Sequence, residues 1–354
     1  PNMAGATTSS NRSTKRSRPN QTHMSTPLTY KEAGVDIEKA AALVGDIGEL
    51  RMRTEAKRQL FQSFGLFAAG FDLGSYSEPV IFTGCDGVGT KLKVLLERDE
   101  LEIAGKDLVA MNVNDVLTAG ADPIMFLDYV GVGKIDKTKI KRVIAGMVDH
   151  LEACGCILAG GETAEMPDMV EDDMIELSGF CIGAAEKKDL IDPSTVSVGD
   201  VVIGCASDSF HANGWSLVRR VLDTQAIELS DDEWKELLAP TRLYHKECDA
   251  LKAAGIKARA MAHITGGGFP ENLERLLDGK GAQIKLPTWE NSSAQKILHH
   301  IEDDEAIRTF NMGFGWVVLV SPEDAKAAIN TMPRSQVLGE ITDGSFHVEI
   351  ASSK

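Results

Sequence analysis

At 354 residues the chain is longer than one hydrophobic core usually serves, so we expect two domains. The formal net charge of −16 argues against nucleic acid as a partner, and the sequence has no apolar run long enough to favour a membrane. The six cysteines lack C-x-x-C spacing, which favours reduced thiols in a cytoplasmic compartment over a zinc site.

Residues 1–28 are basic, rich in Ser and Thr and nearly free of large apolar side chains, so we expect a disordered leader or extension. A transit peptide has a similar composition. The pair His23-Met24 is also typical of an expression leader joined to a start codon, which is the interpretation we favour. The fold prediction therefore begins after this stretch.

Residues 29–190 are predicted to form an N-terminal α/β domain. Buried strands are expected at 79–84, 124–133, 156–161 and 178–185, with a helix at 106–121. A second helix is expected between Asp136 as N-cap and Gly155 as C-cap. Its apolar face would consist of Ile140, Val143, Ile144, Met147, Val148 and Leu151.

The run EKKDLIDPSTVSVGD (186–200) loses hydrophobic periodicity and contains a proline, so it is the expected boundary to a C-terminal α/β domain at 191–354. In that domain we expect strands near 201–207, 258–264, 315–320 and 345–350, and helices near 213–223, 240–254, 270–278 and 322–331. The predicted fold class is α/β to α+β, with two tandem α/β domains.

The stretch TGCDGVGTK (83–91) has the glycine spacing of a phosphate-binding P-loop, but Thr90 and Lys91 stand in inverted order and Asp86 adds a carboxylate. A carboxylate beside phosphate is repulsive unless a cation lies between them. The loop is therefore either unrelated to phosphate or binds it through a metal. A tight turn capped by Asp86 is an equally good interpretation of this motif alone.

The helix 106–121 aims Asp107, Asn114 and Asp115 along one side, an arrangement suited to hard cations. The alternative is an ordinary solvated face, although the Lys and Arg typical of such faces are missing. GGETAEMP (160–167) follows another predicted strand and adds Glu162 and Glu165. Three acidic, glycine-containing elements in successive αβ units favour a site for a magnesium nucleotide.

Two glycine-containing turns open helices in the second domain: SFHANGWS (209–216) and HITGGG (263–268). Free backbone N–H groups at such turns favour an anion, and HITGGG would suit a phosphate monoester. The alternatives are a flexible turn for HITGGG and a structural role for His211.

Ten ordered stretches between about Leu28 and Ile350 resemble the phosphoribosylformylglycinamidine cyclo-ligase family, also called aminoimidazole ribonucleotide synthetases. They are YKEAGVDI (30–37), TGCDGVGTK (83–91), DLVAMNVND (107–115), FLDYVGVGK (126–134), GGETAEMP (160–167), SGFCIGAAEK (178–187), HANGWSLVR (211–219), LLAPTRLY (237–244), AHITGGGFPENL (262–273) and RTFNMGFG (308–315). The superfamily also includes formylglycinamidine ribonucleotide synthetase and selenophosphate synthetase.

The resemblance implies ATP-driven closure of formylglycinamidine ribonucleotide to aminoimidazole ribonucleotide, the fifth step of purine biosynthesis, through an iminophosphate. It also implies a homodimer in which N-terminal strands of two chains build a β-barrel. Two rivals remain: a superfamily kinase or synthetase that acts on another acceptor, and a non-catalytic ATP-binding homologue. Other members have a GGxGGFG loop where LFQSFGLFAAG (60–70) keeps only Phe64-Gly65.

The resemblance and the motifs together assign roles to individual residues. The expected magnesium ligands are Asp86, Asp107, Asn114, Asp115 and Glu162. ATP is expected to contact Lys31, Gly87, Gly89, Thr90, Lys91, Asn112, Gly160, Gly161, Thr163 and Glu165. The expected substrate contacts are His211, Asn213, Gly214, Ser216, Thr265, Gly266, Gly267, Gly268 and Asn311. The expected catalytic residues are Asp86, Lys91, His211 and His263.

Overall fold

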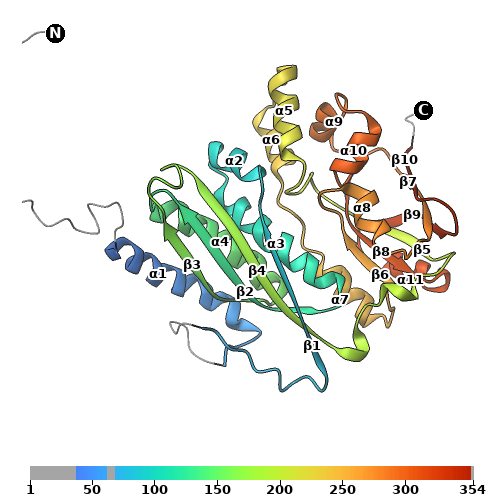
Figure 1. Ribbon diagram of the computed structural model, residues 1–354, viewed down its shortest axis with the longest axis horizontal. Coiled ribbons are helices and arrows are strands. Elements are labelled where there is room, and N and C mark those ends of the chain that lie inside the picture. Colours follow the sequence, from blue (N-terminus) through green and yellow to red (C-terminus); the bar gives the residue numbers. More distant parts are fainter. Residues whose placement is uncertain (1–36, 62–67, 352–354) are drawn as a thin grey trace, which may run out of the picture.

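The computed structural model describes residues 37–61 and 68–351, which form two α/β halves that lie side by side (Figure 1). We call residues 37–190 the N-terminal half and the rest the C-terminal half. The predicted leader 1–28, Lys31 and Phe64-Gly65 fall outside the described residues. In the described part of the chain, no helix combines the length and apolar content that a bilayer crossing requires.

The N-terminal half is built on a four-stranded sheet in the order β1-β4-β2-β3. Its strands are β1 (Pro79–Gly87), β2 (Asp122–Val132), β3 (Ile157–Glu165) and β4 (Ile175–Glu186). Only the β2–β3 pair is parallel, and α4 forms the crossover that a parallel pair requires. The other helical elements are α1 (Ile37–Arg51), η1 (Met52–Ala56), α2 (Lys91–Glu97), α3 (Leu101–Thr118) and α4 (Lys137–Cys154).

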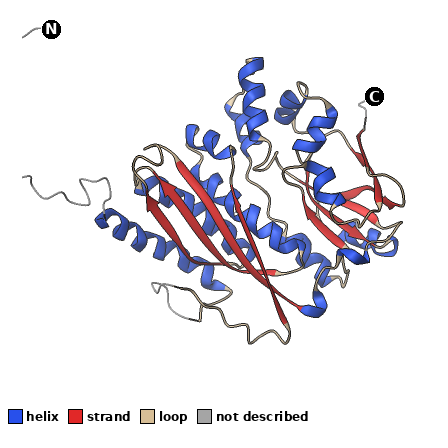
Figure 2. Ribbon diagram, viewed as in Figure 1, coloured by secondary structure: helices blue, strands red, loops and turns tan. Residues whose placement is uncertain are grey.

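Helices α3 and α4 cover one face of this sheet (Figure 2). The predicted caps of α4 are confirmed: the Asp136 carboxylate accepts from the N–H groups of Thr138 and Lys139, and Gly155 ends the helix with φ 71°. Along the opposite face, Ile81 and Phe180 are 55% and 40% exposed. No described helix covers that face of the sheet, and it exposes these apolar side chains to solvent.

The C-terminal half contains a six-stranded sheet in the order β10-β7-β9-β5-β8-β6. Its strands are β5 (Val201–Ala206), β6 (Ala260–His263), β7 (Gly281–Leu286), β8 (Phe314–Val320), β9 (Ser335–Thr342) and β10 (His347–Ile350). Every residue of β8 is buried, which makes this strand the centre of the second core.

Seven α-helices and two short 3-10 turns complete the described C-terminal part of the chain and the link before it. They are α5 (Trp215–Gln225), α6 (Asp231–Leu238), α7 (His245–Ala253), α8 (Gly268–Glu274), α9 (Ser292–Leu298), α10 (Asp303–Thr309), α11 (Pro322–Thr331), η2 (Lys187–Asp189) and η3 (Pro193–Thr195). The predicted domain division at 190/191 falls between η2 and η3.

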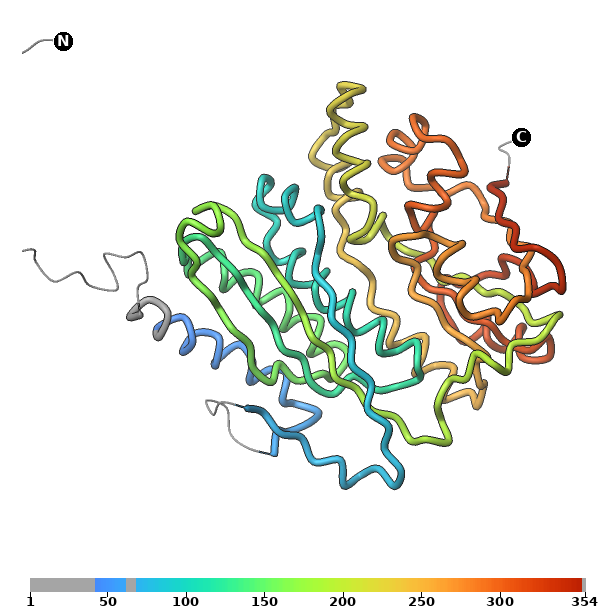
Figure 3. Tube along the Cα trace, viewed as in Figure 1, coloured from blue at the N-terminus to red at the C-terminus, as the bar shows by residue number. Residues whose placement is uncertain are grey.

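The predicted helix 240–254 begins five residues late, at His245. Residues 239–244, which we call the seam segment, run extended between the two halves from α6 down to α7 (Figure 3). The N–H groups of Thr241, Arg242 and Tyr244 bond to side chains of other elements, as described below, so they are not available for helical i→i+4 bonds. The periodicity of the sequence does not reveal this competition.

Two glycines bring α3 and α4 into close contact. A Cβ on Gly105 would lie 2.0 Å from the Val143 carbonyl oxygen, and a Cβ on Gly146 would lie 2.0 Å from that of Glu102. Both contacts are to backbone, which cannot rotate out of the way. The absence of a side chain at these two positions therefore sets the distance between the helices.

Replacing Gly146 by Ala is expected to lower the free energy of unfolding by about 1–3 kcal/mol, because overpacking outweighs the gain in helix propensity. Urea denaturation followed by circular dichroism measures this. The matched control is Gly45→Ala in α1, where no atom lies within 4 Å of the added carbon, so stability should rise by about 0.5–1 kcal/mol. Equal stability of Gly146→Ala and the wild type would contradict the packing argument.

Candidate active site

Asp86 is held at the end of β1 by the side chain of Asn112 on α3. The Asp86 N–H donates to Asn112 Oδ1 at 2.9 Å, and Asn112 Nδ2 donates to the Asp86 carbonyl at 3.2 Å. The Asp86 carboxylate itself accepts only a local bond, from Gly87 N at 2.7 Å. Burial raises the pKa of Asp86, and the nearby Asp115 carboxylate adds to the rise. The backbone of Asp86 is thus fixed by Asn112, while the negative charge of its carboxylate has little stabilisation from the protein.

Asp115 and His263 lie next to this carboxylate. His263 Nδ1 is 2.9 Å from Asp115 Oδ1, and His263 Nε2 is 3.3 Å from Asn114 Nδ2. Because Asn114 Nδ2 is a donor, Nε2 must accept and the ring proton is on Nδ1. His263 at the end of β6 therefore points its Nδ1–H at Asp115, across the contact between the two halves.

The seam segment is bound along α3 by a series of side-chain to backbone hydrogen bonds. Asp107 Oδ1 accepts from Thr241 N at 2.6 Å. About two helical turns further along α3, Asn114 Nδ2 donates to the Arg242 carbonyl at 2.9 Å, and Asn114 Oδ1 accepts from Tyr244 N at 3.1 Å. The oxygens of Asp107 and Asn114 thus contact protein groups in this structure, and the assignment of these residues as magnesium ligands stays a prediction.

Lys91 also lies away from any solvent-facing site. Its ammonium is 2.8 Å from Asp107 Oδ2, and both side chains are fully buried. It donates to the Ala239 carbonyl at 3.2 Å and lies over the Trp215 ring, 5.7 Å from its centroid. The expectation that Lys91 faces the ATP phosphates is therefore not met in this structure. Its neighbours Gly89 and Thr90 are exposed, and Gly87 is half-buried.

His211 is buried in the left-handed region at φ 61°. Its Nε2 accepts from Arg242 N at 3.4 Å, and its ring centre lies 6.5 Å from that of His263. Burial holds the pKa of His211 well below its usual range, and the positive charges of Lys91 and Arg242 act in the same direction. The Nε2 of His211 is thus occupied by the seam segment in this structure, and its expected catalytic role stays a prediction.

The HANG and HITGGG turns lie next to each other, as the sequence predicts for one substrate site. A Cβ on Gly266 would be 3.6 Å from Asn213 Oδ1. Gly214 and Gly267 have positive φ at the starts of α5 and α8, while Ser216 and Gly266 are exposed and Thr265 is half-buried. Gly268 is buried against the Ile307 carbonyl. The exposed part of the two turns is open to a ligand.

Asn311 has a different position from the one expected. It is 2% exposed, its Nδ2 donates to the Ser209 carbonyl at 2.9 Å, and its Oδ1 accepts from Gly313 N at 3.0 Å. These bonds join the 207–213 and 311–313 loops behind the HANG turn. Asn311 supports the site and does not face a ligand in this structure.

The GGETAEMP stretch continues β3 and does not end it, because the strand extends to Glu165. Asp86, Gly179, Asp128 and Gly161 form one row across the sheet. Glu162 belongs to the next row, so it lies on the opposite, open face and three strands from Asp86. Thr163 follows on the helix-covered face, and Gly160 precedes the row. The structure does not bring Glu162 together with Asp86.

Glu165 also has a structural partner: its Oε1 accepts from Ile135 N at 2.7 Å. Within residues 37–61 and 68–351, no group of three or more His, Cys, Asp or Glu side chains is close enough to hold a metal by itself. The acidic residues of the predicted site therefore remain in two places: Asp86 with Asp115 beside the C-terminal half, and Glu162 on the open face.

Sequence reasoning missed Asp128. It is 7% exposed in the middle of β2, and burial raises its pKa to about 7, with Glu162 adding a smaller effect. It shares the row of Asp86 and leans over Gly161, where an added Cβ would lie 2.3 Å from its Oδ1. The signal was present in FLDYVGVG, where a carboxylate occupies an inward position between apolar residues.

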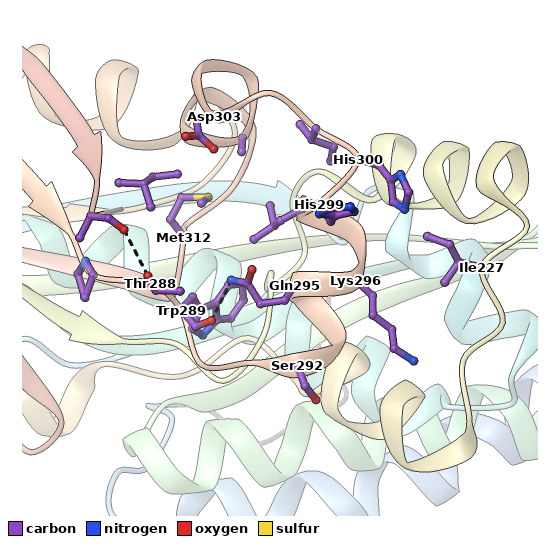
Figure 4. Close-up of a pocket in the computed structure, with 16 residues that line it drawn as sticks. Ile227, Thr288, Trp289, Ser292, Gln295, Lys296, His299, His300, Asp303 and Met312 are labelled. Atoms are coloured by element: carbon purple, nitrogen blue, oxygen red, sulfur yellow. Dashed lines mark hydrogen bonds between the residues drawn. The ribbon is translucent and has the colours of Figure 1, made fainter. Parts of the chain in front are cut away.

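A cavity of about 850 Å³ opens in the C-terminal half, between α9, α10 and the end of β10 (Figure 4). Trp289, Gln295, His299 and Met312 are part of its lining, and Gln295 Nε2 donates to the Trp289 carbonyl at 2.9 Å. None of the residues predicted for the site lines it. The cavity is thus separate from the cluster around Asp86.

Comparison with known proteins assigns both halves. Residues 72–185 match the family "AIR synthase related protein, N-terminal domain", and residues 197–350 match "AIR synthase related protein, C-terminal domain". Among solved structures, thiamine-monophosphate kinase from Stenotrophomonas maltophilia is 17% identical with a TM-score of 0.64, covering 85% of this chain and 94% of that one. The hydrogenase maturation protein HypE in complex with ATP is 15% identical, also at 0.64, covering 88% and 91%. These two show a shared fold.

Relatives in sequence are more similar. A protein of Caldanaerobacter subterraneus named phosphoribosylformylglycinamidine cyclo-ligase is 40% identical over 333 residues, covering 90% of this chain and 98% of the relative. A protein of the same name from Methylobacillus flagellatus is 43% identical over 311 residues, covering 85% and 89%. At this identity, over nearly the full length of both relatives, the chain belongs to the phosphoribosylformylglycinamidine cyclo-ligase family.

Proposed function

We propose that the chain closes the imidazole ring of aminoimidazole ribonucleotide from formylglycinamidine ribonucleotide, with ATP converted to ADP and phosphate. The observation that carries this is the 40% identity to a cyclo-ligase over 98% of that relative's length. Neither a kinase on another acceptor nor a non-catalytic homologue is favoured by such relatives. The six free cysteines fit a cytoplasmic enzyme, where thiols stay reduced.

The chemistry requires transfer of the γ-phosphoryl group of ATP to the formyl oxygen of the substrate. An amidine nitrogen then attacks the activated carbon, the five-membered ring closes and phosphate leaves. Such a transfer depends on positioning and charge neutralisation more than on covalent help from the protein. The exposed backbone of Gly89 and Gly266 and the hydroxyls of Thr90 and Ser216 are available to hold anionic oxygens.

Magnesium fits the donor set around Asp86. Two carboxylates, Asp86 and Asp115, lie near each other, and the charge of Asp115 contributes to the raised pKa of Asp86. A divalent cation would relieve that repulsion, and carboxylate oxygens are its preferred ligands. We therefore assign magnesium to Asp86 and Asp115, where it would neutralise phosphate charge. His263 holds Asp115 in place through its Nδ1 proton.

We also propose that two copies of the chain pair through the open face of the N-terminal sheet. Ile81 and Phe180 lie on neighbouring strands of that face and are largely exposed. Exposed apolar side chains on one face of a sheet favour a protein partner. In such a homodimer the two sheets would build the expected barrel, and Glu162 would lie at the interface, available to a site shared between the copies.

Incubation with formylglycinamidine ribonucleotide, ATP and magnesium should yield aminoimidazole ribonucleotide together with equal amounts of ADP and phosphate. Asp86→Asn should lower kcat by roughly 10²-fold or more, most strongly at limiting magnesium, because one anionic metal ligand is lost. Asp343→Asn, at an exposed acid outside the site, is the matched control and should retain wild-type kcat. Absence of product from the wild type at saturating substrates would refute the proposed function.

Light scattering should report a mass of twice the 38.2 kDa of one chain for the wild type. Phe180→Glu should shift this to the mass of a single chain, because a buried unpaired charge at the interface is costly. Val198→Glu, at a 57% exposed position in the C-terminal half, should leave the mass unchanged. A wild type that stays monomeric at micromolar concentration would rule out the pairing.

A further inference from the structure

The contact between the halves contains a fully buried ion pair. Lys91 and Asp107, on α2 and α3 of the N-terminal half, meet at 2.8 Å with no exposed side-chain surface. Each also holds a backbone atom of the C-terminal half: Lys91 Nζ donates to the Ala239 carbonyl, and Asp107 Oδ1 accepts from Thr241 N. The pair therefore binds the first half of the seam segment.

The second half of the seam segment is held in the same manner. Asn114 bonds the Arg242 carbonyl and Tyr244 N, and His211 Nε2 accepts from Arg242 N. A displacement of the segment by one residue would break all of these bonds together, since each is to a particular backbone atom. The series of bonds fixes one register of the segment on α3.

Stability alone does not account for a buried ion pair at this place. Removing two charges from water costs several kcal/mol per ion, and well-packed apolar residues of similar volume are often as stable or more so. Burial lowers the pKa of Lys91, and the opposing effect comes from Asp107, which raises it. What an ion pair adds over apolar packing is specificity of position.

We propose that Asp107, whose buried charge Lys91 balances, is a positioning residue: its bond from Thr241 N sets the register of the seam segment on α3. The register of the segment thereby fixes the positions of His211 and His263 in the C-terminal half relative to Asp86 in the N-terminal half. The role rests on the proposed function, because it concerns the geometry of that same site. Neither residue contacts substrate, metal or ATP in this assignment.

Two double variants separate positioning from stability. Lys91→Met with Asp107→Asn removes both charges but keeps an oxygen that accepts from Thr241 N. Lys91→Met with Asp107→Leu removes the charges and that acceptor at nearly equal volume. In both, Ser209 Oγ still donates to the Ala239 carbonyl at 2.7 Å. The two variants therefore differ in one hydrogen bond to the seam segment.

Assayed at a temperature where circular dichroism shows each variant folded, the Asn variant should keep kcat within about threefold of wild type. The Leu variant should lose about tenfold or more in kcat, with KM for ATP little changed, because misplacement of reacting groups affects the transition state most. Arg142→Met, which breaks an ion pair with Glu102 on the outer side of α3, should leave kcat unchanged. Equal kcat values for the two double variants would overturn the proposal.

Amide hydrogen exchange of unliganded protein gives a readout that does not depend on activity. Exchange at Thr241, Arg242 and Tyr244 should be at least about tenfold faster in the Leu variant than in the Asn variant, because a released segment opens more often. If the wild type makes no product, the proposed function fails while this comparison still decides the positioning role. Equal exchange rates in the two variants would refute it.

Discussion

The structure depends on one constraint: helix α3 buries polar side chains on two sides, and each must find a partner. Asp107, Asn112 and Asn114 are fully buried, and an unpaired polar group at that depth costs a few kcal/mol. Asn112 is satisfied by the backbone of Asp86 on one side. Asp107 and Asn114 are satisfied by the seam segment on the other. One helix therefore fixes the positions of both halves.

This arrangement separates the groups that hold the site together from those that remain available for chemistry. Lys91, Asp107 and Asn114 are fully engaged with one another and with the seam segment. Asp86 and Asp115 keep partial exposure, and of the two only Asp115 is bound by His263, through its Nδ1–H. The negative charges of Asp86 and Asp115 lie beside exposed glycine turns, Asp86 next to Gly89 and Asp115 next to HITGGG through His263. An anionic ligand with its cation would fit there.

The sequence predicted the strands of the first sheet and α4 well, because long buried runs and a capped amphipathic helix give strong periodic signals. It missed the strands β7 and β9 and the helices α1, α2, α6, α9 and α10, most of which are short. At the site, the structure brings together the HANG and HITGGG turns, both of which the sequence assigned to the substrate. It could not foresee that Lys91 and Asp107 would meet each other, because polarity in a motif does not reveal whether the partner is a ligand or another residue.

The seam segment is bound through its backbone N–H and C=O groups, which every residue except proline possesses. These bonds do not depend on which side chain a residue has: the bond from the Thr241 N–H to Asp107 would survive any replacement that this fully buried position can hold. The number of residues between α6 and α7 has no such freedom, since an insertion or deletion would move every donor and acceptor out of place. A redesign of this contact must therefore keep the number of residues in the segment more strictly than their identity.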